Sequence, residues 1–211
     1  MKIAVLGATG MIGRRVVDEA LARGHEVTAF ARDPSGLAPA ERLSFAQGDV
    51  SNPLDLAKAL SGQQAIVSAV GPNARSAPSI VVAATRTVAA ACMKADVKRV
   101  LVVNGAGSLS VKPGLELLAT PDFPAAWRDV ALAHREALAM WRRVKELEWT
   151  VVSPAALVEL GPRTGTYRTG HDELLVDDQG VSRISADDLA VAILDELDHG
   201  GHFYERITFA Y

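Results

Sequence analysis

Three glycines at three-residue spacing, directly after a short apolar run, constrain this chain more than any other feature. The run Lys2–Leu6 stops at Gly7, and Gly10 and Gly13 open a stretch with helical periodicity that ends before Gly24. In a strand–turn–helix unit, the first glycine permits a tight turn, the second admits a diphosphate to the backbone, and the third lets helix and strand pack closely. The helix N-terminus then offers free N–H groups and partial positive charge to an anion. The opening therefore predicts a dinucleotide diphosphate over this turn; the alternative is a glycine-rich turn without a ligand.

The rest of the chain alternates between short apolar runs and helical stretches. The predicted strands are residues 2–6, 26–31, 43–48, 65–70, 100–103, 150–153, 173–176, 182–185 and 207–209. The predicted helices are residues 11–23, 54–60, 80–95, 124–147 and 187–197. Strands joined through helices favour right-handed crossovers and a parallel sheet covered on both faces. We expect an α/β doubly wound sheet, one domain over residues 1–211, with small C-terminal elements that cover the substrate.

Composition excludes several classes of protein. Hydrophobic residues make up 49% of the 211 residues and charged residues 22%, which excludes a disordered chain. The net charge of -3 gives no large positive field for nucleic acid or an anionic membrane, and no stretch reaches the ~20 apolar residues of a membrane helix. A lone cysteine, Cys92, fits a reducing compartment. We therefore expect a cytoplasmic monomer or homodimer that binds a small molecule, and neither nucleic acid nor membrane.

The end of the second predicted strand bears on which nicotinamide dinucleotide binds. An acidic side chain there accepts from the 2′-OH of NAD, whereas an arginine pairs with the 2′-phosphate of NADP. Arg32 occupies this position and Ala31 is not acidic, but the adjacent Asp33 could neutralise the arginine. We expect NADP(H) to be preferred over NAD(H), with Arg32 as the phosphate contact. An arginine in a solvated loop is the alternative.

The ends of later strands supply the other expected cofactor contacts. Asp49 could accept from the adenine amino group with Val50 packed on the ring, or it could cap the following helix. The turn at residues 70–72 would pass the middle of the cofactor, and Asn104 could bond the ribose or the carboxamide. The expected cofactor-binding residues are Gly7, Thr9, Gly10, Met11, Ile12, Gly13, Arg32, Asp49, Val50, Val70, Gly71, Pro72, Asn104 and Gly105.

Several motifs together resemble a known family. Residues 7–13 (GATGMIG) and 48–50 (GDV) are similar to the atypical short-chain dehydrogenase/reductase superfamily. Residues 102–109, 120–124, 149–156, 163–168 and 182–190 look like the bacterial NADH-flavin reductase group and, more distantly, biliverdin reductase B. The resemblance covers nearly the whole chain and implies an NAD(P)-binding Rossmann fold. It also implies that Ser153, Pro154 and Ala155 offer backbone groups to the nicotinamide carboxamide.

The superfamily's catalytic tyrosine, with a lysine four residues later, has no counterpart here. The resemblance puts that position on the predicted helix 124–147, which contains no tyrosine and offers His134 instead. The accompanying serine is replaced near Asn104, unless Ser108 reaches back. We take His134, whose ordinary pKa suits a general acid, and Ser108 as candidate catalytic residues. A surface histidine and a loop serine are the alternatives.

The missing proton donor favours one kind of reaction. A positioned general acid is worth roughly 10²–10⁴ in rate for alcohol–ketone chemistry, whereas hydride transfer to a flavin can take its proton from water. Tyr167 could stack on a flavin ring, and Arg163 and Arg168 could meet its phosphate. We therefore predict NAD(P)H-dependent reduction of a flavin (FMN or FAD), a quinone or a similar planar acceptor.

Two further expectations complete the sequence analysis. The alternative function is an NADP(H)-binding, redox-sensing regulatory protein without strong catalytic activity. We expect no metal site, because His199 and His202 have close spacing but no further cluster of ligands in register.

Overall fold

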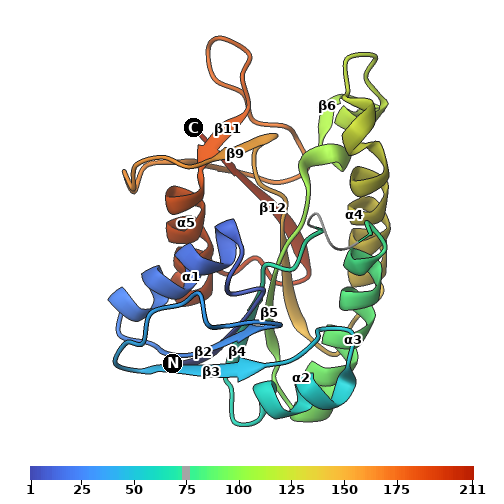
Figure 1. Ribbon diagram of the computed structural model, residues 1–211. Helices are drawn as coiled ribbons and strands as arrows, with labels where there is room; N and C mark the ends of the chain where they lie inside the picture. The colour runs from blue at the N-terminus through green and yellow to red at the C-terminus, as the bar shows by residue number, and fades with distance from the viewer. Residues whose placement is uncertain (73–76) are drawn as a thin grey trace.

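One large, mostly parallel sheet organises the molecule, and the computed structural model describes residues 1–72 and 77–211 (Figure 1). Its strand order is β10-β12-β8-β5-β4-β1-β2-β3. These strands are β1 (Lys2–Leu6), β2 (Glu26–Ala31), β3 (Leu43–Gln47), β4 (Ala65–Ser68), β5 (Arg99–Val103), β8 (Glu148–Val152), β10 (Arg168–Gly170) and β12 (Glu205–Ala210). Every neighbouring pair is parallel except β10 with β12. The chain builds outward from β1 to β3 and then returns to β4 on the other side of β1. This change of direction opens a crevice at the carboxyl ends of the strands.

Helices cover both faces of the sheet, as Figure 1 shows. One face carries α1 (Met11–Ala22) and α5 (Ala186–His199), and the other carries α2 (Pro53–Leu60), α3 (Ile80–Ala95) and α4 (Arg128–Trp141). Each interface is filled by its own apolar cluster, which explains why the central strands are apolar on both sides. The expected doubly wound α/β fold is thereby confirmed.

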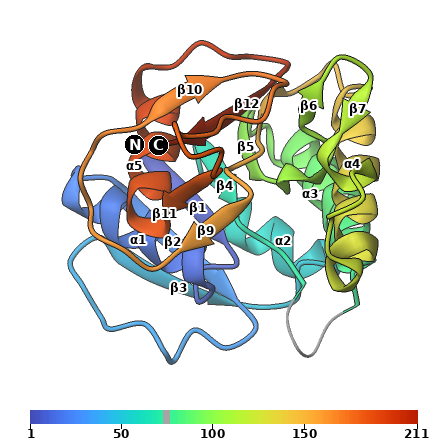
Figure 2. The same cartoon turned by 90° about the horizontal axis from the view of Figure 1, so that it is seen from above.

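Two small sheets follow the carboxyl ends of β5 and β8. After β5 come the 3₁₀ turn η1 (Ala106–Ser108) and a hairpin of β6 (Ser110–Lys112) with β7 (Leu115–Glu116). After β8, β9 (Leu157–Glu159) pairs in parallel with β11 (Arg183–Ser185), which leads directly into α5. Figure 2 shows that the chain between β9 and β10 passes α1 on its way round the molecule.

The structure corrects several predicted boundaries. The predicted helix 124–147 is shorter, because its first residues form the 3₁₀ turn η3 (Ala125–Trp127) and α4 ends at Trp141; a further 3₁₀ turn, η2 (Leu117–Ala119), lies before it. The predicted strand 173–176 is wrong: only Glu173 makes an isolated bridge, to Ser110. Neither β10 nor the β6–β7 hairpin was expected, since runs of two or three residues carry no readable periodicity.

Candidate functional site

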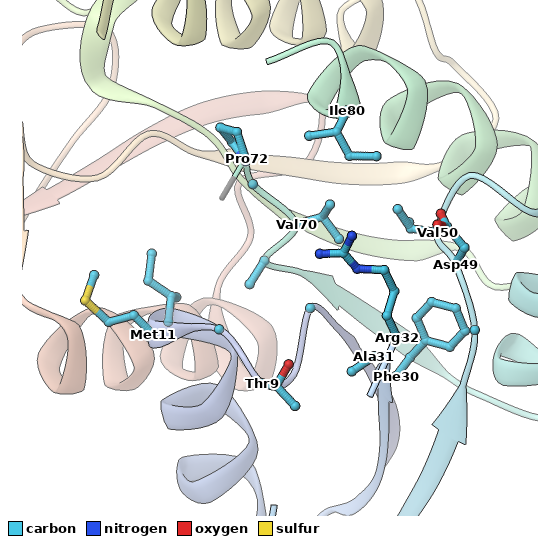
Figure 3. A pocket seen from close by; sticks show the side chains of 16 residues that line it. Thr9, Met11, Phe30, Ala31, Arg32, Asp49, Val50, Val70, Pro72 and Ile80 are labelled. Atoms are coloured by element: carbon cyan, nitrogen blue, oxygen red, sulfur yellow. The ribbon is translucent and has the colours of Figure 1, made fainter. Parts of the chain in front are cut away.

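A cleft of about 540 Å³ lies at the carboxyl ends of β1, β2, β3 and β4 (Figure 3). The crevice beside β1 is therefore a cavity, at the position where doubly wound folds bind their ligands. Residues that line it come from four strand ends and from the starts of α1 and α3: Gly7, Thr9, Gly10, Met11, Ile12, Phe30, Ala31, Arg32, Gly48, Asp49, Val50, Ala69, Val70, Gly71, Pro72 and Ile80. Most of the residues expected to bind the cofactor are thus brought together.

The glycine turn forms the floor of this cleft. Gly7 has a left-handed φ of 76°, and a Cβ on Gly13 would lie 2.1 Å from the Gly7 carbonyl oxygen, so only glycine lets α1 start so close to β1. Gly10 is the N-cap of α1 and has no side chain to cap the first N–H groups. Those donors and the helix dipole remain directed at the cleft, as a diphosphate requires.

Arg32 lies at the end of the cleft that the ends of β2 and β3 form. Figure 3 shows its guanidinium extending across the opening toward Val70. Asp33 forms no ion pair with Arg32 within 4.0 Å, and its Oδ1 accepts from the Ser35 backbone N–H at 3.0 Å. Contacts with Ser35 lower the pKa of the Asp33 carboxyl, which keeps this carboxylate ionised.

The loop after β3 is fixed by the first turn of α2. The Asp49 N–H donates to Asp55 Oδ2 at 3.0 Å, and Asp49 Oδ1 accepts from the Ser51 N–H at 2.8 Å. Asn52, rather than Asp49, caps α2 by accepting from the Leu54 N–H. The question of which residue caps this helix is therefore resolved, and Asp49 stays in the wall of the cleft.

Sequence reasoning missed five lining residues: Phe30, Ala31, Gly48, Ala69 and Ile80. Four of them are neighbours of predicted contacts at strand ends, so extending each motif by one or two positions would have found them. Ile80 gave no such signal, because its place depends on how α3 packs beside β4. The chain between Pro72 and Ala77 lies outside the described residues, so the cleft is described without it.

Asn104 and His134 form a tight pair next to the cleft. Asn104 Nδ2 donates to the His134 backbone oxygen at 3.2 Å, and its Oδ1 lies 2.6 Å from His134 Nδ1. The imidazole of His134 packs against Gly105, where a Cβ would lie 3.1 Å from Cδ2. Asn104 also borders a small void that shares Val70 with the cleft. Through Val70, Asn104 is thus one residue away from the lining of the cleft, and His134 lies behind it.

Burial sets the charge of His134. Desolvation lowers the pKa of His134 to about 4, so the imidazole is neutral at pH 7. Because the amide of Asn104 presents its oxygen to Nδ1, that nitrogen carries the proton and Nε2 carries the lone pair. This His134 can accept a hydrogen bond through Nε2, but it cannot be the imidazolium acid that an ordinary pKa would provide.

Ser108 is turned away from the cleft. Its Oγ accepts from Arg206 Nη1 at 2.9 Å, and Arg206 Nε also donates to Asp172 at 2.7 Å. Arg206 is a buried residue of β12. It therefore connects β12 both to η1, through Ser108, and to Asp172, which precedes the isolated bridge of Glu173 with Ser110. Ser153, Pro154 and Ala155 lie at the carboxyl end of β8 and are buried, outside the lining of the cleft.

The three residues expected around the acceptor lie on the α1–α5 side of the sheet. Arg163 makes a two-pronged pair with Glu19 of α1, at 2.8 and 2.9 Å. The Tyr167 hydroxyl donates to Asp195 of α5 at 2.5 Å, and its ring packs edge-on against Phe209. Arg168 donates to the backbone oxygens of Val176 and Tyr211. The structure does not bring this trio to the cleft.

Two remaining observations concern metals and membranes. Within residues 1–72 and 77–211 no group of three or more His, Cys, Asp or Glu side chains is arranged to hold a metal ion. In the same part of the chain, no helix is both long and apolar enough to span a membrane. Cys92 is buried in α3, and desolvation raises the pKa of its thiol to about 12.

A glycine turn at a helix N-terminus, opening onto a cleft at the switch point of a parallel sheet, defines the class of dinucleotide-binding Rossmann proteins. The comparisons with known proteins agree with this class. The model of a family described as NAD(P)H-binding matches residues 7–199, and the chain belongs to that family.

Three similar structures extend over the full chain. A "putative exported protein" of Burkholderia pseudomallei is 46% identical, with 100% of both chains covered and a TM-score of 0.91. A "putative epimerase" of Bacteroides thetaiotaomicron is 38% identical, with 100% of this chain and 96% of that chain covered and a TM-score of 0.93. A "putative NADH-flavin reductase" of Streptococcus pneumoniae is 33% identical, with 100% and 99% covered and a TM-score of 0.88. The resemblance found in the sequence motifs is confirmed at the level of the family and the fold.

Proposed function

We propose that this protein is an NADPH-dependent reductase of a flavin, a quinone or a similar planar acceptor. The observation that carries the proposal is the combination of a dinucleotide cleft with a neighbouring Asn104–His134 pair that contains no acid at neutral pH. Bound NADPH would supply a hydride, and an acceptor of this kind can take its accompanying proton from water. The name of the Streptococcus pneumoniae relative supports the same reaction class.

The residues present fit the cofactor's parts. The floor of glycines and the open N-terminus of α1 suit a diphosphate, and Arg32 at the adenosine end suits a 2′-phosphate. Asp49 and Val50 stand where adenine would lie, and Val70 also lines the small void that Asn104 borders. The protein would then hold the nicotinamide ring and the planar acceptor in contact and exclude water from between them.

In this proposal His134 positions the acceptor and does not protonate it. A neutral imidazole whose Nδ1–H is held by Asn104 presents a single lone pair at Nε2. Such a group can accept from an N–H of the acceptor, which an isoalloxazine ring offers and a simple quinone lacks. Flavins are therefore the acceptors that this site suits best.

The same absence of an acid supports a second candidate, a regulatory protein that senses the NADPH/NADP ratio and docks on a partner. Described tyrosine hydroxyls are engaged elsewhere or exposed: Tyr167 donates to Asp195 and Tyr211 donates to Asp188. A dinucleotide site without a proton donor is compatible with binding alone. For either function we propose a cytoplasmic monomer or homodimer that binds no nucleic acid.

One assay separates these two functions. Purified protein is mixed with NADPH and FMN, or with NADPH and menadione, and the reduced-nicotinamide absorbance is followed. Turnover well above the rate without protein supports the reductase; tight NADPH binding with no turnover on either acceptor contradicts it and supports the sensor.

Cofactor preference is tested by Arg32→Ala. Losing a charged contact costs about 1.5–3 kcal/mol, so the KM for NADPH should rise by roughly 10-fold or more while that for NADH stays the same. The matched control is Arg143→Ala, in the turn after α4 and before the amino end of β8. If the Arg32 variant keeps its preference for NADPH, the assignment of Arg32 is wrong.

A further inference from the structure

Two arginines contribute positive charge to the exposed segment that follows β2. Arg32 begins this segment, and Arg14, in the first turn of α1, contacts it four residues further on, where Nη2 donates to the Gly36 carbonyl at 2.7 Å. Both arginines are exposed. One residue of α1 and one that follows β2 thus bring positive charge to the same loop at the adenosine end of the cleft.

Neither guanidinium has a carboxylate partner within 4.0 Å in the part of the chain that the structure describes. The two other arginines of α1 and its C-cap differ in this respect. Arg15 pairs with Asp187 at 2.8 Å, and Arg23 pairs with Glu19 at 2.8 Å. Asp33, next to Arg32 in sequence, accepts a hydrogen bond from Ser35, and Asp18, four residues after Arg14, forms no ion pair with it within 4.0 Å. Within the described residues, Arg14 and Arg32 are therefore not part of an ion pair.

We propose that Arg14 acts with Arg32 to bind the 2′-phosphate of NADP(H), and that Arg14 is a second residue that determines cofactor specificity. This inference rests on the proposed function and adds a contact to it. A phosphomonoester carries nearly two negative charges and several acceptor oxygens, so a second guanidinium adds both charge and donors.

The bond to Gly36 prepares Arg14 for this contact. A guanidinium has five N–H donors in a fixed plane, and the carbonyl of Gly36 takes one of them. The group is thereby held over the loop while its remaining donors stay free. Holding a long side chain before the ligand arrives lowers the entropy cost of binding.

The test compares Arg14→Gln with the wild-type protein by calorimetry. Gln removes the charge and keeps a polar side chain at an exposed position, so the fold should be retained. Titrants are NADP⁺, NAD⁺ and 2′,5′-ADP, which isolates the phosphate. We expect the variant to bind NADP⁺ and 2′,5′-ADP roughly 10-fold more weakly, with NAD⁺ affinity unchanged.

Two further variants sharpen the result. Arg143→Gln removes the same charge in the turn between α4 and the amino end of β8 and should leave all three affinities unchanged. Arg14→Lys keeps the charge but loses the planar fork, so it should fall between the wild type and Arg14→Gln.

The outcomes are distinguishable. If Arg14→Gln weakens NADP⁺ and NAD⁺ equally, or weakens neither, the inference about Arg14 is overturned and the proposed reductase stands. If the wild-type protein binds no nicotinamide nucleotide at all, the proposed function fails, and this inference fails with it.

Discussion

Gly13 shows how a single residue can decide whether the site exists. Its missing side chain leaves room for the Gly7 carbonyl, and any Cβ there would lie 2.1 Å from that oxygen. Since the obstacle is backbone rather than a flexible side chain, α1 would have to move away from β1.

We predict that Gly13→Ala lowers the free energy of unfolding by about 1–3 kcal/mol, because overpacking forces the backbone to shift. It should also weaken NADPH binding, since the donors at the start of α1 move with the helix. Urea unfolding and calorimetry measure the two effects. The control is Gly201→Ala, where no atom lies within 4 Å of the added Cβ. Equal stability of the two variants would show that the close approach is not needed.

His134 makes stability depend on pH. In the unfolded chain its pKa is near the ordinary 6.5, and burial lowers the pKa to about 4 in the fold. The folded state therefore binds fewer protons, so stability is full above pH 6.5 and declines as the pH falls from about 6.5 to 4. The decline is complete once the pH lies below the folded value.

We predict that His134→Gln flattens this part of the stability–pH curve. Unfolding by urea at pH 7 and pH 5 measures the difference, and the NMR titration of the His134 ring gives its pKa directly. A midpoint near 6.5 in the native protein would contradict the burial of this imidazole and would restore it as an acid.

At the scale of elements, α1 and α5 are tied together by the chain between β9 and β10. Arg163 of that chain pairs with Glu19 of α1. The fully buried Asp188 of α5 accepts from the N–H groups of Thr164 and Gly165 and from the Tyr211 hydroxyl. These bonds make the segment a strap across two helices, which explains why Arg163 and Tyr167 do not reach the cleft.

This placement predicts a structural effect for Tyr167→Phe. Loss of the hydrogen bond to Asp195 should cost about 1 kcal/mol of stability. The KM for FMN should remain unchanged, because the ring stays packed on Phe209 and lies away from the cleft. Thermal unfolding and steady-state kinetics give the two quantities. A large rise in the KM for FMN would return Tyr167 to the acceptor site.

For the whole molecule, the cleft joins segments that are far apart in sequence, from Gly7 to Ile80. A ligand that binds only when these segments are assembled must stabilise the fold. At a concentration 100 times its Kd, such a ligand adds about 2.7 kcal/mol, which corresponds to roughly 5–10 °C in Tm for a domain of this size.

We predict a rise of this size with NADP⁺ and a smaller rise with NAD⁺ at the same concentration. Differential scanning fluorimetry measures both, with 5′-AMP as a weak reference. No shift with either dinucleotide at saturating concentration would contradict binding in the cleft.

The sequence by itself determined the parallel strands of the sheet, the glycine turn and the strand ends that line the cleft. These features are local: a tight turn needs glycine, a buried parallel strand needs an apolar run, and the carboxyl ends of such strands meet at one edge. Residues 7–13, Arg32 and Asp49 could therefore be assigned from their position along the chain.

Only the tertiary structure decided what the polar side chains of the second half do. Ser108 lies in a part of the sequence where we expected site residues. In the structure, the buried Arg206 of β12 donates a hydrogen bond to its hydroxyl oxygen. The charge of His134 depends on burial against Asn104 and Gly105, about thirty residues away in sequence, which no local pattern encodes. Each polar group has several possible hydrogen-bond partners far away in sequence. Which partner it binds is determined only when strands and helices distant in sequence pack together.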